Sequence, residues 1–133
     1  IIKKMKKYIF AAMASAVLYS CGAVSTQNQP VLANTQWQLS DQVKGNQPTL
    51  VSENTRVSGN GGCNNYFGDL QADPATGSFS VKGIGATKKM CENIAGETTY
   101  FNMLPKANRY RISGSTLELY QNDLLLLKFS KIK

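Results

Sequence analysis

The sequence predicts a mainly β domain, a strongly curved antiparallel sheet or barrel of about eight strands with one helix packed on it. Polar and apolar residues alternate in several short segments between residues 35 and 129, which is the pattern of half-buried strands. The last of these segments are joined by hairpin-sized links, and one segment changes to a helical period. The length of 133 residues fits a single domain.

The first predicted strand covers residues 35–39, where the alternation turns Trp37 and Leu39 inward. Turn-forming residues at 53–54 and 73–77 predict tight turns between later strands. The other predicted strands are residues 49–51, 55–57, 65–71, 78–81, 109–113, 116–120 and 124–129.

A glycine-rich run at residues 57–68 predicts a tight corner between two strands at Gly59 to Gly62, because glycine accepts positive φ angles and close backbone approach. Asn64 is predicted to hydrogen bond to the backbone. A second glycine group, residues 83–86, predicts that its strand bends or stops there. The structural motif of the first run is Gly59, Gly62, Asn64, Tyr66 and Gly68.

The helix is predicted between residues 92 and 104, where Ile94 and Phe101 belong to a set of helically spaced positions. Glu97 belongs to the same set and lies near the N-terminal end, where a negative charge suits the helix dipole. Pro105 should end the helix or mark its last turn. Glu92 and Glu97 lie on different faces of such a helix, so we expect solvated or capping roles rather than a catalytic acid pair.

The N-terminal residues predict export. Residues 1–20 have the lysine-rich start and short apolar stretch of a bacterial signal peptide. Residues 18–22 resemble a lipoprotein lipobox, which makes Cys21 the predicted lipidation site; the alternative is an ordinary cleaved signal with an incidental cysteine. Residues 21–33 are small and polar and predict a flexible tether, followed by a domain at 34–133.

Lipidation would anchor the chain to a membrane through its acyl chains. By the bacterial sorting rule, Gly22 rather than an aspartate after Cys21 favours the outer membrane. The segment from Ser25 to Gln29 has no acidic run of the kind that directs surface export, so we expect the protein to face the periplasm.

Charge and composition argue against several kinds of site. The net charge of +7 falls to +3 without the four lysines among the first seven residues, too little for a nucleic-acid surface. The chain has no histidine, so the commonest general base and metal ligand is missing, and no metal or cofactor is expected. The glycine run lacks the lysine and following helix of a phosphate-binding loop.

Cys63 and Cys91 form an even pair in a chain predicted to be exported, which is typical of a structural disulfide. A redox pair is the alternative, although the Cys-x-x-Cys spacing of oxidoreductases is missing. The aromatic residues are most simply core. Trp37, Phe79 and Phe101 are the candidates for lining an apolar cavity inside the barrel.

The order of these elements resembles the META domain family and its HslJ-type heat-shock lipoproteins. The resemblance covers about residues 34–129 and depends on the Gly-Cys-Asn element at Gly62, the second cysteine at Cys91 and the segment from Glu97 to Phe101. It departs at residues 89–90, where the family often has Met-Ala. The resemblance implies a cracked antiparallel barrel with one helix and an envelope protein without established catalytic activity.

We therefore expect a non-enzymatic, monomeric envelope lipoprotein that supports stress tolerance by binding a protein or lipid partner. The first alternative is a carrier that holds an acyl chain inside the barrel. The second is an enzyme, which would need a free Cys63 or Cys91 and a cleft with shifted carboxylates.

Overall fold

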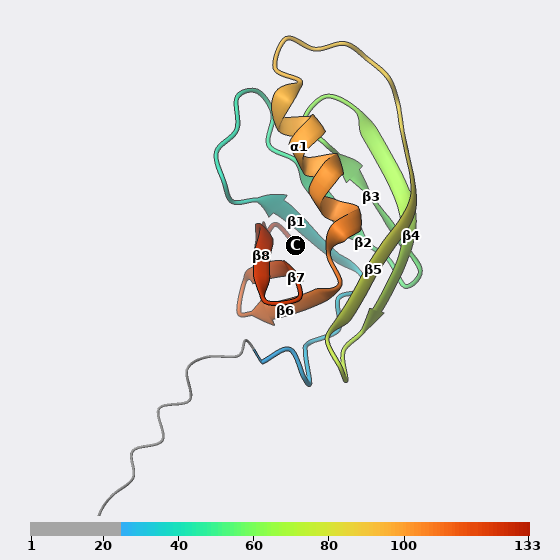
Figure 1. The fold of residues 1–133 in the computed structure, drawn as a ribbon, viewed down its shortest axis with the longest axis vertical. Coiled ribbons are helices and arrows are strands. Elements are labelled where there is room, and N and C mark those ends of the chain that lie inside the picture. The colour runs from blue at the N-terminus through green and yellow to red at the C-terminus, as the bar shows by residue number, and fades with distance from the viewer. Residues whose placement is uncertain (1–24) are drawn as a thin grey trace, which may run out of the picture.

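The computed structural model describes residues 25–133, so the predicted signal peptide and Cys21 lie outside the described residues. Eight antiparallel strands form a closed ring, with one helix, α1 (Ala95–Met103), and a short 3-10 turn (Leu104–Lys106) (Figure 1). The predicted mainly β fold is confirmed. The strands are β1 (Thr35–Leu39), β2 (Thr49–Ser52), β3 (Arg56–Asn60), β4 (Asn65–Asp73), β5 (Ser78–Ala86), β6 (Arg109–Ser113), β7 (Thr116–Gln121) and β8 (Leu124–Lys131).

The ring is uneven. Each strand pairs with its neighbour in the chain and β1 closes onto β8, but β5 and β6 meet at only one residue pair, Ser78 with Arg109. The chain between β5 and β6 carries α1. Tyr100 of α1 stacks edge-on against Tyr66 of β4 and Phe129 of β8, which come from well-separated strands of the ring. The helix therefore covers the ring from one side.

One glycine prediction is confirmed in part and one is wrong. β5 runs through residues 83–86 rather than stopping, but its register with β4 shifts there and Gly83 has a φ of +62°. The ring of Phe67 on β4 lies over Gly85, where a Cβ would be 2.8 Å from the ring. Gly59 is not at the corner but inside β3, opposite Tyr66. It must be glycine, because a Cβ there would lie 2.3 Å from the carbonyl oxygen of Thr49. The turn itself consists of residues 61–64.

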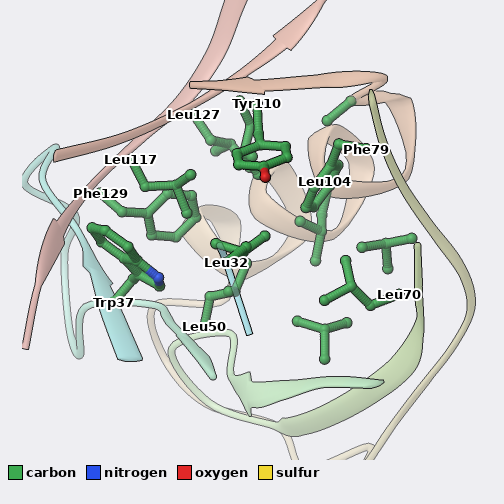
Figure 2. Close-up of a cluster of buried hydrophobic side chains, with 14 of the residues drawn as sticks. Leu32, Trp37, Leu50, Leu70, Phe79, Leu104, Tyr110, Leu117, Leu127 and Phe129 are labelled. Atoms are coloured by element: carbon green, nitrogen blue, oxygen red, sulfur yellow. The ribbon is translucent and has the colours of Figure 1, made fainter. Parts of the chain in front are cut away.

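The interior of the ring is filled by side chains from nearly every strand. Trp37 and Leu39 point inward as predicted, with exposed fractions of 0% and 7%. Figure 2 shows part of this cluster. Its members without any exposed surface are Trp37, Leu50, Val57, Leu104, Tyr110, Leu117, Leu119 and Phe129.

Residues 25–33, here called the strap, pack against the ring, whereas the sequence places them in a flexible tether. Figure 2 shows the Leu32 side chain in the middle of the core cluster, and it is only 2% exposed. Thr26 is equally buried and accepts a 2.6 Å hydrogen bond from the Arg109 guanidinium. Gln29 accepts from the backbone N–H of Ile112 on β6. The strap thus binds the ring near its weak β5–β6 seam.

Within residues 25–133, no helix has the length and hydropathy needed to cross a bilayer.

The buried position of Leu32 predicts a large effect of its truncation. Leu32→Ala should lower the free energy of unfolding by about 2–5 kcal/mol, because it removes buried methyl groups and leaves a cavity in the core. The neighbouring Val31 is 64% exposed, so Val31→Ala is the matched control and should change stability by less than about 0.5 kcal/mol. Urea titration measures both. Equal stabilities of the two variants would show that the strap does not pack as described.

Candidate functional site

A buried carboxylate fixes the start of α1 to the corner between β3 and β4. Glu97 is 5% exposed, and its Oε2 accepts hydrogen bonds from the backbone N–H groups of Cys63 at 2.7 Å and Asn64 at 2.6 Å. Its Oε1 accepts from the side-chain amide of Asn64 at 2.6 Å. Burial alone would raise the pKa of Glu97, but these three hydrogen bonds outweigh it and hold the pKa below its usual value.

Asn64 joins the same corner to the loop before α1. Its Oδ1 accepts from the backbone N–H of Lys89 at 2.6 Å and from the Thr87 hydroxyl at 2.9 Å. Its amide nitrogen also donates to the Lys89 carbonyl at 3.2 Å. Asn64 therefore makes the predicted backbone hydrogen bonds, and it does so to both the N–H and the carbonyl of Lys89.

The structure places a disulfide between Cys63 and Cys91, the pairing that the sequence predicts, with the Cα atoms 6.1 Å apart. It closes a loop of 28 residues, for which chain entropy gives about 3–4 kcal/mol of stabilisation. The disulfide, Asn64 and Glu97 connect the corner, the loop and α1. We call these four residues, with Glu97 at their centre, the corner cluster.

The corner cluster is built for structure rather than for chemistry. Both oxygens of Glu97 are occupied, and no buried polar side-chain atom in residues 25–133 is without a hydrogen-bond partner. In the same residues, no three side chains of cysteine, aspartate or glutamate gather as metal ligands do. Glu92 is exposed and precedes α1, which begins at Ala95 rather than at residue 92, so the two glutamates do not share a helix. Glu97 is buried rather than solvated.

Two tyrosines lie beside the corner cluster. The hydroxyls of Tyr66 and Tyr100 are 2.6 Å apart, and that of Tyr66 donates to the Thr49 carbonyl at 2.8 Å. Burial raises the pKa of both phenols, so both remain neutral. Of the remaining motif residues, Gly68 lies on β4 with its Cα close to β5; a Cβ would be 3.2 Å from the Lys82 carbonyl oxygen.

The three aromatic residues predicted to line an interior pocket do not do so. Trp37 and Phe79 belong to the filled core, with exposed fractions of 0% and 3%. Phe101 packs edge-on against Tyr66, with its ring 2.6 Å from where a Cβ of Gly61 would lie. None of the three lines an apolar cavity that lies on the surface beside α1.

That cavity is a half-open apolar groove of about 360 Å³ between α1, the segment after β1 and the start of β8. Asp41 contributes the one charged side chain among the described residues that line it. Sequence reasoning, which searches for reactive groups, missed the groove because its lining is apolar. The sequence feature that could have indicated it is the run of four leucines in β8, which interrupts the alternation of polar and apolar residues. The lining residues are Leu39, Asp41, Val43, Ala95, Gly96, Thr99, Tyr100, Met103, Leu126 and Leu127.

Comparisons with known proteins support the fold. A family model described as the META domain matches residues 30–132. The chain is similar to an NMR structure of a protein from Burkholderia xenovorans, with a TM-score of 0.63 and 22% identity over 83% of this chain and 93% of that one. It is also similar to the crystal structure of a DUF4847 family protein from Bacteroides vulgatus, with a TM-score of 0.55 and 14% identity over 75% of this chain and 94% of that one. No curated protein sequence matches the chain.

The lowered pKa of Glu97 predicts a pH-dependent contribution to stability. The contribution is present above the unfolded pKa of about 4.3 and is lost as the pH falls through the lower, folded pKa. Glu97→Gln should therefore lower the free energy of unfolding at pH 7 by about 1–3 kcal/mol, since one N–H loses its acceptor. The difference from the wild type should shrink in acid.

The exposed Glu92 supplies the matched control, because Glu92→Gln removes the same charge from a position outside the corner cluster. Denaturant titrations of the wild type and both variants at several pH values measure the effect. A Glu97→Gln deficit that stayed constant down to pH 2 would contradict the assigned hydrogen bonds.

Proposed function

The chain belongs to the META domain family, and from that premise we propose that it is a non-enzymatic envelope lipoprotein that binds a partner through the groove between α1 and β8. One observation carries the proposal: the surface groove is apolar, while the buried carboxylate of the corner cluster has both oxygens occupied by hydrogen bonds. Apolar concave surfaces with few polar groups are typical of binding sites.

The geometry of the strap supports an anchored protein that turns the corner cluster away from the membrane. The strap contacts the β4–β5 turn, where the backbone N–H of Gln29 donates to the Pro74 carbonyl. The corner held by α1 lies at the other end of the nine-residue strand β4, about 30 Å away. Cys21 lies four residues before Ser25, a reach of at most about 14 Å. A lipid on Cys21 would hold the β4–β5 end at the membrane.

The same proposal assigns the protein to the periplasmic face of the bacterial outer membrane, from the sequence around Cys21. Its contribution there would be to envelope stress tolerance, as the family resemblance implies, and it would act as a monomer with a protein or lipid partner.

An acyl-chain carrier is the second candidate, favoured by one observation. The groove volume of about 360 Å³ lies within the range of small-molecule sites. The bound chain would occupy this groove and not the ring interior, which core side chains fill. Native mass spectrometry separates the candidates, because a carrier would retain a mass matching a fatty acid.

Lipidation at Cys21 is tested by labelling cells with radioactive palmitate. The wild type should incorporate the label and sediment with membranes, and Cys21→Ala should do neither. The double variant Cys63→Ser/Cys91→Ser keeps Cys21 and should remain labelled, which controls for general thiol acylation. An unlabelled, soluble wild type would overturn the anchored part of the proposal.

Partner binding is tested by chemical cross-linking of intact envelopes followed by purification of the tagged full chain. We expect partner proteins to be enriched with the wild type and lost with Met103→Glu, since Met103 lines the groove. Met90→Glu is the matched control, because Met90 is 89% exposed and lies outside the groove. If both variants and the wild type capture the same proteins, the groove is not the binding surface.

A further inference from the structure

The first half of β8 is an open sheet edge. β1 pairs with β8 only from Phe129 to Lys131, and the last contact between these strands is the N–H of Ser40 donating to the Lys128 carbonyl. The residues 124–127 pair with β7 on one side, and within residues 25–133 they make no backbone hydrogen bond on the side of β1. The ring is therefore closed at the second half of β8, residues 129–131, and open at its first half, residues 124–127.

Leu126 is the extra residue of a β-bulge in this part of β8. The β7–β8 register shifts between Leu119 and Tyr120, so that Leu127 and Leu125 have partners on β7 whereas Leu126 has none. Leu126 also has no partner on β1. Backbone donors and acceptors at a sheet edge favour pairing with another extended chain.

This edge lacks the protection that edge strands usually have. Natural edges are covered, or carry lysine or proline that prevents pairing. Here four leucines follow one another, and Leu124 and Leu125 have exposed fractions of 63% and 44%. Along β8 the first cation after the open part is Lys128, which lies opposite Glu118 of β7.

The open edge and the groove are continuous, because Leu126 and Leu127 also line the groove. An extended peptide along β8 would place alternate side chains over the groove and pair its backbone with β8. Asp41, exposed at the groove, is complementary to a basic residue of the peptide. An acyl chain could fill the groove but would leave the edge donors and acceptors unpaired.

We infer that β8 binds an extended apolar segment of a partner protein, bearing lysine or arginine beside the apolar residues, as an added strand along residues 124–127. This inference rests on the proposed function, because it names how the groove engages its protein partner.

The test uses the full chain, purified in a mild detergent, and a fluorescein-labelled octapeptide of alternating valine and threonine with lysine at both ends. Fluorescence anisotropy should show binding, and backbone amide NMR signals of residues 124–128 should shift. The same peptide with its four central amides N-methylated should bind at least about tenfold more weakly, because those amides can no longer donate hydrogen bonds to the edge. A version with glutamate at both ends should also bind more weakly.

A matched pair of variants locates the binding on the protein. Leu125→Lys places a charge on the open edge and should weaken binding, whereas Phe67→Lys, at the similarly exposed Phe67 on β4, should not. Equal binding of the N-methylated peptide, or amide shifts confined to α1, would overturn strand addition. So would sedimentation as a dimer that Leu125→Lys dissociates, since a second copy would then occupy the edge.

The experiments distinguish a failure of strand addition from a failure of the proposed function. If envelope partners depend on Met103 but peptide binding does not depend on backbone donors, the groove binds a partner by another mode and only strand addition is lost. If no envelope protein is captured, the proposed function itself falls.

Discussion

The hydrogen bonds of the Glu97 carboxylate determine where α1 lies. This helix buries only two of its residues, Glu97 and Tyr100, and has no side-chain cap at its N-terminus. An apolar face of that size fixes a nine-residue helix poorly, because most helical stability in proteins comes from packing. Three hydrogen bonds to a buried, ionised carboxylate supply the specific geometry instead.

The position of α1 in turn creates the surface that we assign to binding. Half of the residues lining the groove come from α1, and they face the start of β8 across the groove. The ring interior is occupied by Trp37, Phe129 and other core residues, and Leu32 of the strap adds to this filling. The binding surface that we propose therefore lies on the outside of the ring, where α1 and the open edge of β8 meet.

The sequence predicted the strands, the inward side of Trp37 and the cysteine pair, because these depend on local alternation, turn residues and cysteine number. It failed where tertiary contacts override local pattern. Leu32 lies in a polar segment with no periodicity, so its place in the core could not be inferred. The helical spacing of Glu97 is the same whether its charge interacts with the helix dipole or its carboxylate binds the β3–β4 corner, so the spacing could not distinguish these roles. The groove arises from an early end of pairing between β1 and β8, which depends on register.

Hydrogen exchange of the Cys63 and Asn64 amides, before and after reduction of the disulfide, tests most directly whether Glu97 holds the corner cluster together. If Glu97 does so, both amides should stay protected in the reduced protein, since their acceptor is the carboxylate and not the cystine. Loss of their protection on reduction, with the β4 and β5 amides still protected, would contradict this account and assign the position of α1 to the disulfide.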